Sequence, residues 1–173
     1  YEKGKLLGDR RKYDRFEADL RAFHPVIGKK NIMAYRAVWG STGSGTPDSM
    51  RFSVGGAESV RGYEYGAFDG YDQFYATVEN RTQINKTLQF VTFFDIGNAW
   101  QKESINAAGR RTYSPDRKSA HDFKDLKKGY GVGLRINTPV GPLRFDYGWP
   151  MDPEKPGKKK DKGKFYFSFG QSF

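Results

Sequence analysis

The feature that most constrains this chain is a two-residue alternation of apolar and polar side chains, repeated in segments of about ten residues. In the segment 88–96, for example, Phe90 and Phe94 alternate with the polar Gln89 and Asp95. Such alternation is typical of β-strands with one apolar and one polar face, and it predicts an all-β, antiparallel fold. Seven segments follow the pattern clearly, namely 13–23, 31–40, 72–81, 88–96, 130–136, 143–149 and 165–173, and a weaker eighth lies near 1–7.

The composition argues that the apolar faces do not all enclose a dry core. Aromatic residues make up 16% of the chain, although its mean hydropathy is only −0.81. A transmembrane barrel resolves this conflict, because its outer face carries an aromatic band towards lipid while its interior is wet. A soluble RNA-binding β-domain with exposed stacking rings is the competing interpretation. The net charge of +10 fits either nucleic acid or anionic lipid and lipopolysaccharide.

The connections between the segments alternate between short and long. The short ones cover 25–30, 82–86 and 138–142, and the long ones cover 41–71, 101–128 and 150–164. Outer-membrane barrels have short periplasmic turns and long extracellular loops, whereas soluble domains rarely keep their long loops at one end. The pattern therefore predicts an up-and-down transmembrane β-barrel, or the C-terminal half of one.

The phase of the alternation sorts the charged strand residues onto one face. An arginine that faces lipid at mid-membrane costs about 2–4 kcal/mol, so we expect this face to line the lumen. Trp39, Trp100 and Trp149 fall at strand ends beside long connections, as expected of an interfacial aromatic girdle. The residues predicted to face inwards are Arg36, Glu79, Arg81, Asp95, Arg135, Arg144 and Asp146.

The connection 41–71 is unusual because it is not polar throughout. It contains Gly55 and Gly56, followed by the tetrad Val60, Arg61, Gly62 and Tyr63. Here the chain resembles the outer-membrane assembly factors typified by BamA, with TamA and the two-partner secretion transporters as relatives. The signature of that family is a Val-Arg-Gly-Tyr/Phe tetrad after a Gly-Gly pair, in a long loop that folds back into the barrel. Further stretches resemble the family in the same order: 94–100 (FDIGNAW), 129–136 (GYGVGLRI), 138–147 (TPVGPLRFDY) and 165–173 (FYFSFGQSF).

The arginine of the tetrad is the principal candidate site residue. If the loop enters the barrel, Arg61 leaves bulk water and must find carboxylates, because a guanidinium keeps its charge. Glu79 and Asp95 lie on the predicted inner face of neighbouring strands. The resemblance implies that acids at these places pair with the tetrad arginine, so we predict an Arg61–Glu79/Asp95 cluster.

The resemblance also implies how the chain fits into a larger protein. The family barrel has about sixteen strands and follows periplasmic POTRA domains, so residues 1–173 are expected to form its C-terminal part. The chain begins without a signal peptide, which indicates a fragment of a longer mature protein. Whether the strands close into a small barrel, or two copies form a homodimer through open edges, stays open. The predicted terminal assembly signal and seam are Phe165, Phe167, Phe169, Gly170 and Phe173.

By resemblance, the function is the assembly and insertion of unfolded β-barrel precursors in the bacterial outer membrane, with lipid and lipopolysaccharide as further partners. The alternatives are protein secretion by a two-partner transporter or a patatin-type autotransporter relative, and a passive porin. An enzyme is not expected, since His24 and His121 are far apart and cysteine is absent. Neither a Gly-x-Ser-x-Gly nor a phosphate-binding motif occurs. The sequence accordingly predicts no metal, no cofactor and no nucleic-acid partner.

Overall fold

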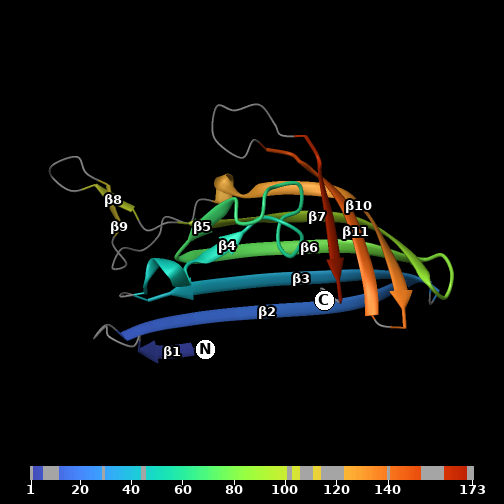
Figure 1. Ribbon diagram of the computed structural model, residues 1–173, viewed down its shortest axis with the longest axis horizontal. Coiled ribbons are helices and arrows are strands. Elements are labelled where there is room, and N and C mark those ends of the chain that lie inside the picture. The colour runs from blue at the N-terminus through green and yellow to red at the C-terminus, as the bar shows by residue number, and fades with distance from the viewer. Residues whose placement is uncertain are drawn as a thin grey trace.

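The computed structural model describes residues 2–5, 12–28, 30–43, 46–100, 103–105, 111–113, 123–139, 141–152 and 162–170. Eight strands form one antiparallel sheet in the order β1-β2-β3-β6-β7-β10-β11-β12 (Figure 1). The predicted up-and-down arrangement is therefore confirmed. The strands are β1 (Glu2–Lys5), β2 (Lys12–Ile27), β3 (Asn31–Thr42), β6 (Asp72–Gln83), β7 (Leu88–Trp100), β10 (Lys127–Thr138), β11 (Gly141–Pro150) and β12 (Lys164–Phe169).

Two short two-stranded ribbons, which the alternation did not reveal, lie within the long connections. β4 (Phe52–Val54) pairs with β5 (Phe68–Gly70) between β3 and β6. β8 (Glu103–Ile105) pairs with β9 (Arg111–Tyr113) after β7. Two 3₁₀ helices, η1 (Asp48–Met50) and η2 (Phe123–Asp125), also belong to these connections. Among the described residues, no helix is long and apolar enough to cross a membrane.

The short connections link adjacent strands by only a few residues. Residues 28–30 join β2 to β3, 84–87 join β6 to β7, and 139–140 join β10 to β11. In the second turn, the Asn85 side chain accepts hydrogen bonds from the backbone N–H groups two and three residues later, at 2.9 and 2.8 Å. Such a side-chain bond closes a turn locally. Because the strands are antiparallel, the three turns lie at one end of the sheet and the long connections at the other.

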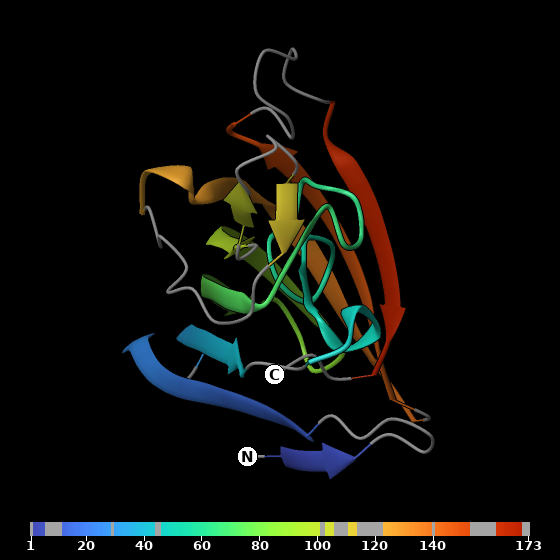
Figure 2. The same cartoon turned by 90° about the vertical axis from the view of Figure 1, so that its left-hand side faces the viewer.

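The sheet curves around the connection between β3 and β6, which lies on its hollow side (Figures 1 and 2). Within the described residues, β1 pairs with β2 alone and β12 pairs with β11 alone, so the sheet is open. The outer strands are therefore edges, and an unpaired edge can accept a further strand.

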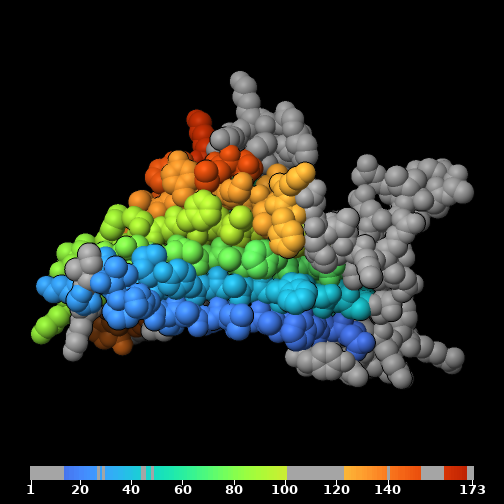
Figure 3. All heavy atoms as spheres, turned by 180° about the vertical axis from the view of Figure 1, so that it is seen from behind, coloured from blue at the N-terminus to red at the C-terminus, as the bar shows by residue number. Residues whose placement is uncertain are grey.

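The two faces of the sheet differ in exposure, as the alternation predicts. On β12, Phe165, Phe167 and Phe169 point outwards and are 62%, 55% and 59% exposed. On the inner face, Glu79 and Asp95 are fully buried beneath the connection between β3 and β6. Figure 3 shows the outer face, on which the strands follow one another from β2 in blue to β11 in orange.

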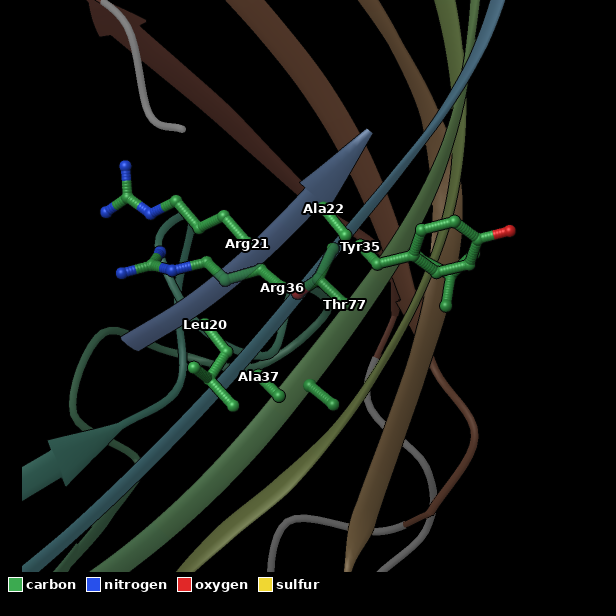
Figure 4. Close-up of a pocket in the computed structure, with 9 residues that line it drawn as sticks. Leu20, Arg21, Ala22, Tyr35, Arg36, Ala37 and Thr77 are labelled. Atoms are coloured by element: carbon green, nitrogen blue, oxygen red, sulfur yellow. The ribbon is translucent and has the colours of Figure 1, made fainter. Parts of the chain in front are cut away.

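A close view of β2, β3 and β6 shows both faces at once. Arg21 and Arg36 point to one side of the sheet, and the ring of Tyr35 points to the other (Figure 4). The outer side carries a shallow hollow of about 310 Å³. Small side chains from adjacent strands, including Ala22 and Ala37, leave this space. The hollow thus follows from the sequence pattern of the outer face.

The tryptophans differ in their exposure. Trp39 and Trp149 are 56% and 37% exposed near the loop ends of β3 and β11, as a girdle requires. Trp100, at the end of β7, is only 7% exposed, which departs from the prediction. η2 lies close to this end of β7. Asn98 donates a hydrogen bond to a carbonyl of η2 at 3.0 Å, and Phe123 lines one hollow together with Trp100.

Candidate functional site

The connection between β3 and β6 turns back along the inner face of the sheet, and we call its residues 46–71 the inner loop. After β4 the backbone folds tightly. The N–H of Gly55 donates to Oγ of Ser59 at 2.7 Å, and the N–H of Gly56 donates to the carbonyl of Val60 at 3.1 Å. This fold buries Val60 completely and so anchors the loop to the wall. Its apolar cluster consists of Val38, Val54, Val60, Tyr63, Tyr75 and Ala99.

Arg61 lies at the centre of the contact between the inner loop and the sheet, with 2% of its side chain exposed. Its Nε and Nη2 donate to the two oxygens of Asp95 at 2.7 and 2.8 Å, a two-pronged geometry that suits a guanidinium. Its Nη1 donates to Oε1 of Glu79 at 2.7 Å. The backbone N–H of Arg61 also donates to Asp95, at 3.0 Å. The guanidinium lies 3.4 Å from the centre of the Phe93 ring, which adds a cation–π contact.

Further charged residues extend this contact onto β10 and β11. Asp146 accepts from Nη1 of Arg135 at 2.5 Å and from Nη2 of Arg144 at 2.9 Å. It also lies 3.4 Å from Nη1 of Arg61. All of these groups are buried. We call the six residues Arg61, Glu79, Asp95, Arg135, Arg144 and Asp146 the inner charge cluster.

The inner charge cluster contains three arginines and three carboxylates, so its formal charges cancel. Two more ion pairs continue it at the rim, from Arg81 to Glu79 at 2.8 Å and from Arg144 to Glu58 at 2.9 Å. Burial by itself lowers the pKa of Arg61, but the carboxylates of Asp95 and Glu79 raise that pKa above its ordinary value. Arg61 therefore stays charged, and the buried charge is compensated on several sides.

Glycines on β10 and β11 let the inner loop approach the wall. A Cβ on Gly129 would lie only 1.9 Å from the carbonyl oxygen of Arg61. Gly62 has a φ of 102°, and a Cβ there would lie 2.7 Å from the backbone nitrogen of Pro150. Side chains at either position would push the loop away from the sheet. The glycine-rich segment 129–136 thus forms a floor on which the tetrad rests.

Two tyrosine hydroxyls hold the end of the tetrad. The hydroxyl of Tyr63 lies 2.9 Å from the carbonyl oxygen of Lys128 and 3.0 Å from that of Asp152. The hydroxyl of Tyr166, on β12, accepts a hydrogen bond from the N–H of Gly62 at 2.8 Å. It donates in turn to the carbonyl oxygen of Tyr63 at 2.6 Å. The loop is therefore bonded to the last strand of the sheet.

The inner loop packs more closely against β10 and β11 than against β2. Between β2 and the loop lies an open hollow of about 590 Å³, lined by charged and aromatic side chains that include Arg15, Glu17 and Tyr65. On the other side, the tetrad contacts the backbones of β10 and β11 directly, as the Gly129 and Gly148 contacts show. The inner loop therefore supports β10 and β11, whereas a hollow separates it from β2.

The structure brings the tetrad together with Glu79 and Asp95 but places the terminal signal elsewhere. Phe165, Phe167 and Phe169 lie on the outer face, Gly170 follows β12, and Phe173 lies outside the described residues. Sequence reasoning placed Asp146, Arg135 and Arg144 on the inner face but did not join them to Arg61. It placed Tyr166 on the polar face of the last strand but assigned it no role. The available signal was that Tyr166 is the aromatic residue on the polar face of the last strand.

Comparison with known proteins supplies the family. The Omp85 superfamily domain matches residues 2–173. This chain belongs to the Omp85 superfamily. Among Omp85-related sequences, the chain is 32% identical over 140 residues to the outer membrane protein assembly factor BamA of Nitratidesulfovibrio vulgaris, covering 73% of this chain and 16% of that protein. It is 30% identical over 120 residues to the chloroplastic outer envelope protein 80 of Arabidopsis thaliana, covering 69% and 14%. The chain thus spans about a sixth of these relatives.

Two solved structures share the fold. BamA from Haemophilus ducreyi, lacking POTRA domains 1–3, superposes with a TM-score of 0.72 at 20% identity, covering 95% of this chain and 36% of that one. CdiB from Acinetobacter baumannii superposes with a TM-score of 0.58 at 24% identity, covering 93% and 27%. At these identities the likeness concerns the arrangement of the strands.

Proposed function

We propose that this Omp85 chain is the C-terminal part of an outer-membrane barrel that assembles and inserts β-barrel precursors. The observation that carries the proposal is the seated tetrad, with Arg61 held by Glu79 and Asp95, in a chain 32% identical to a BamA. The chain is an outer-membrane protein, in contact with lipid through its aromatic outer face. Its substrates would be unfolded outer-membrane proteins, and lipopolysaccharide would be a further lipid partner.

The open edge of β12 gives the mechanism that we propose. Within the described residues, β12 pairs through Lys164–Phe169 with β11 alone. Its second edge can therefore receive a strand from a precursor by β-augmentation, in which backbone hydrogen bonds supply affinity for any strand sequence. Phe165, Phe167 and Phe169 would keep this edge in contact with lipid while the new strand is added.

The inner charge cluster would keep the wall in shape while the edge exchanges partners. Arg61 ties β6 and β7 to the inner loop, and Asp146 ties β11 to the same loop. A barrel with a weak seam needs such internal support, because a strand at an open edge has only one neighbour in the sheet. The residues of the cluster would act on the wall and not on the substrate.

Secretion of a partner protein is the second candidate, favoured by the likeness to CdiB. The two functions differ in what leaves the barrel: a secreted protein crosses through the lumen, whereas a precursor strand leaves sideways into lipid. The open hollow between β2 and the inner loop lies on the lumen side and fits the first route. The 32% identity to a BamA makes assembly the stronger candidate and secretion the weaker one.

Reconstitution tests the proposal. The full-length protein that contains this chain is placed in liposomes, and an unfolded β-barrel precursor is added from urea. We expect faster precursor folding, measured by protease protection, than in empty liposomes. We also expect Arg61→Ala to slow the folding, while Arg51→Ala, in the same loop but paired with the half-exposed Asp69, should slow it far less. If the wild-type liposomes give no acceleration, the proposal fails.

A further inference from the structure

The last strand contacts the inner loop through one buried side chain. Tyr166 is only 5% exposed, although the phenylalanines on either side of it face outwards. Its hydroxyl accepts the N–H of Gly62 at 2.8 Å and donates to the carbonyl of Tyr63 at 2.6 Å. We call this pair of hydrogen bonds the Tyr166 clip. A single hydroxyl thus satisfies a donor and an acceptor of the loop backbone.

Neighbouring contacts strengthen the same junction. The ring of Tyr65 meets the ring of Tyr166 edge to face, with 5.7 Å between centroids and an interplanar angle of 85°. Nζ of Lys164 pairs with Oε1 of Glu64 at 2.5 Å. Loop residues 62–65 therefore contact the inner side of β12, whose sheet partner among the described strands is β11 alone. The loop acts as the second neighbour of an edge strand.

The anchor of the loop and its contact with β12 are separate. Within the described residues, the side-chain hydrogen bonds of Arg61 go to β6, β7 and β11. The contact with β12 is made by the next residues, Gly62 and Tyr63. Moving Arg61 out of the inner charge cluster would move these residues as well, because they follow it directly in the chain.

We propose that the Tyr166 clip makes the position of the last strand depend on whether the inner loop is seated. With the loop seated, β12 is held against the sheet by β11 and by the loop. With the loop displaced, β12 keeps β11 alone and separates from the sheet more often. The consequence for activity rests on the proposed function, since it assumes that the edge of β12 receives the precursor. The coupling of loop and strand stands without that assumption.

The coupling depends on two hydrogen bonds of the Tyr166 hydroxyl, which the loop backbone would lose without it. Removing the hydroxyl by Tyr166→Phe leaves the N–H of Gly62 and the carbonyl of Tyr63 without this partner, in a place where Tyr63 and Tyr166 are buried. A buried backbone group that loses its partner is destabilised enough to change an equilibrium about tenfold. The phenylalanine keeps the ring and its contact with Tyr65, so the substitution isolates the hydroxyl.

Hydrogen–deuterium exchange on the full-length protein in nanodiscs measures the position of β12. We expect Tyr166→Phe to raise exchange in peptides covering 164–170 about tenfold, with little change in β6 and β7. The matched control is Tyr147→Phe, since Tyr147 lies on the outer face of the adjacent strand β11 and is 37% exposed. An unchanged β12 in Tyr166→Phe, or an equal rise in all strands, overturns the proposal.

A double-mutant cycle tests the coupling itself. Arg61→Ala should also raise exchange in β12, although the Arg61 side chain bonds to other strands. If the clip carries the effect, adding Tyr166→Phe to Arg61→Ala gives no further rise. Additive effects would show that loop and strand are independent, and the proposal would be wrong. Precursor insertion by the same proteins is a separate readout: its failure in the wild type counts against the proposed function, while the exchange cycle decides the clip.

Discussion

Replacing Arg61 with alanine is expected to release the inner loop while the sheet remains folded. The substitution removes the two-pronged bond to Asp95, the bond to Glu79 and the contact with the Phe93 ring. It also leaves the inner charge cluster with one carboxylate more than its arginines. Breaking a buried ion pair by removing one partner costs about 3–5 kcal/mol. Arg61 is not part of any strand of the sheet, so the substitution acts first on the seating of the loop.

Limited proteolysis measures the seating directly. An equilibrium shift of about 3–5 kcal/mol raises the population of the open loop about a hundredfold to a few thousandfold. Protease cleavage within the inner loop, residues 46–71, should rise accordingly when cleavage is slower than reclosing. Arg61→Lys should recover only part of the protection, because an ammonium cannot bond both oxygens of Asp95 in a fork while reaching Glu79.

A second arginine of the inner loop, Arg51, serves as the control. Arg51 pairs at 3.2 Å with Asp69, whose side chain is 52% exposed, and an exposed pair is worth about 0–1 kcal/mol. Arg51→Ala should therefore raise cleavage far less than Arg61→Ala. If Arg61→Ala is cleaved no faster than Arg51→Ala, the cluster does not hold the loop and the reasoning is wrong.

Three further predictions concern the floor, the tetrad and the outer face. Gly129→Ala should displace the loop and raise its cleavage, since the new Cβ would meet the carbonyl of Arg61 at 1.9 Å. Tyr63→Phe should lower the stability of the seated loop by about 0.5–1.5 kcal/mol, measured as the same cleavage, because it removes the hydroxyl that lies between the carbonyl oxygens of Lys128 and Asp152. Phe167→Arg should cost about 2–4 kcal/mol of barrel stability, seen as a lower unfolding midpoint in gel-shift assays, whereas Ser168→Arg on the inner face should cost less.

The strands could be predicted because a strand repeats its pattern every two residues. Leu88, Phe90, Phe94 and Ile96 share one face of their segment, although Val91 and Phe93 fall on the opposite face, and the structure extends this strand to Trp100. β2 runs on through Pro25 to Ile27, with an irregular register at its end, because backbone pairing continues where the apolar pattern has stopped. The β4–β5 ribbon was missed since three-residue strands are too short to show a period.

The sequence predicted those parts of the candidate site that depend only on which face of its strand a side chain occupies. Phase places Glu79 and Asp95 on the inner face, and the charge of Arg61 requires an acid nearby. Phase does not say how far across the sheet the loop reaches, so Asp146 on β11 could not be joined to Arg61 from the pattern. Tyr166 could not be assigned for a related reason: its partners are backbone groups, which have no signature in the sequence.

The glycine floor and the inner charge cluster depend on each other. Carboxylates on the wall attract the guanidinium of Arg61, but ion pairs at 2.7 Å require the loop backbone to lie almost on the strands. Gly129 and Gly148 provide that closeness, since a side chain at either position would collide with Arg61 or Gly62. Without the floor the charges would meet across water and bind weakly, because the interaction of charges falls as the dielectric constant rises. The strength of the ion pairs in the inner charge cluster therefore depends on two glycines, which carry no charge.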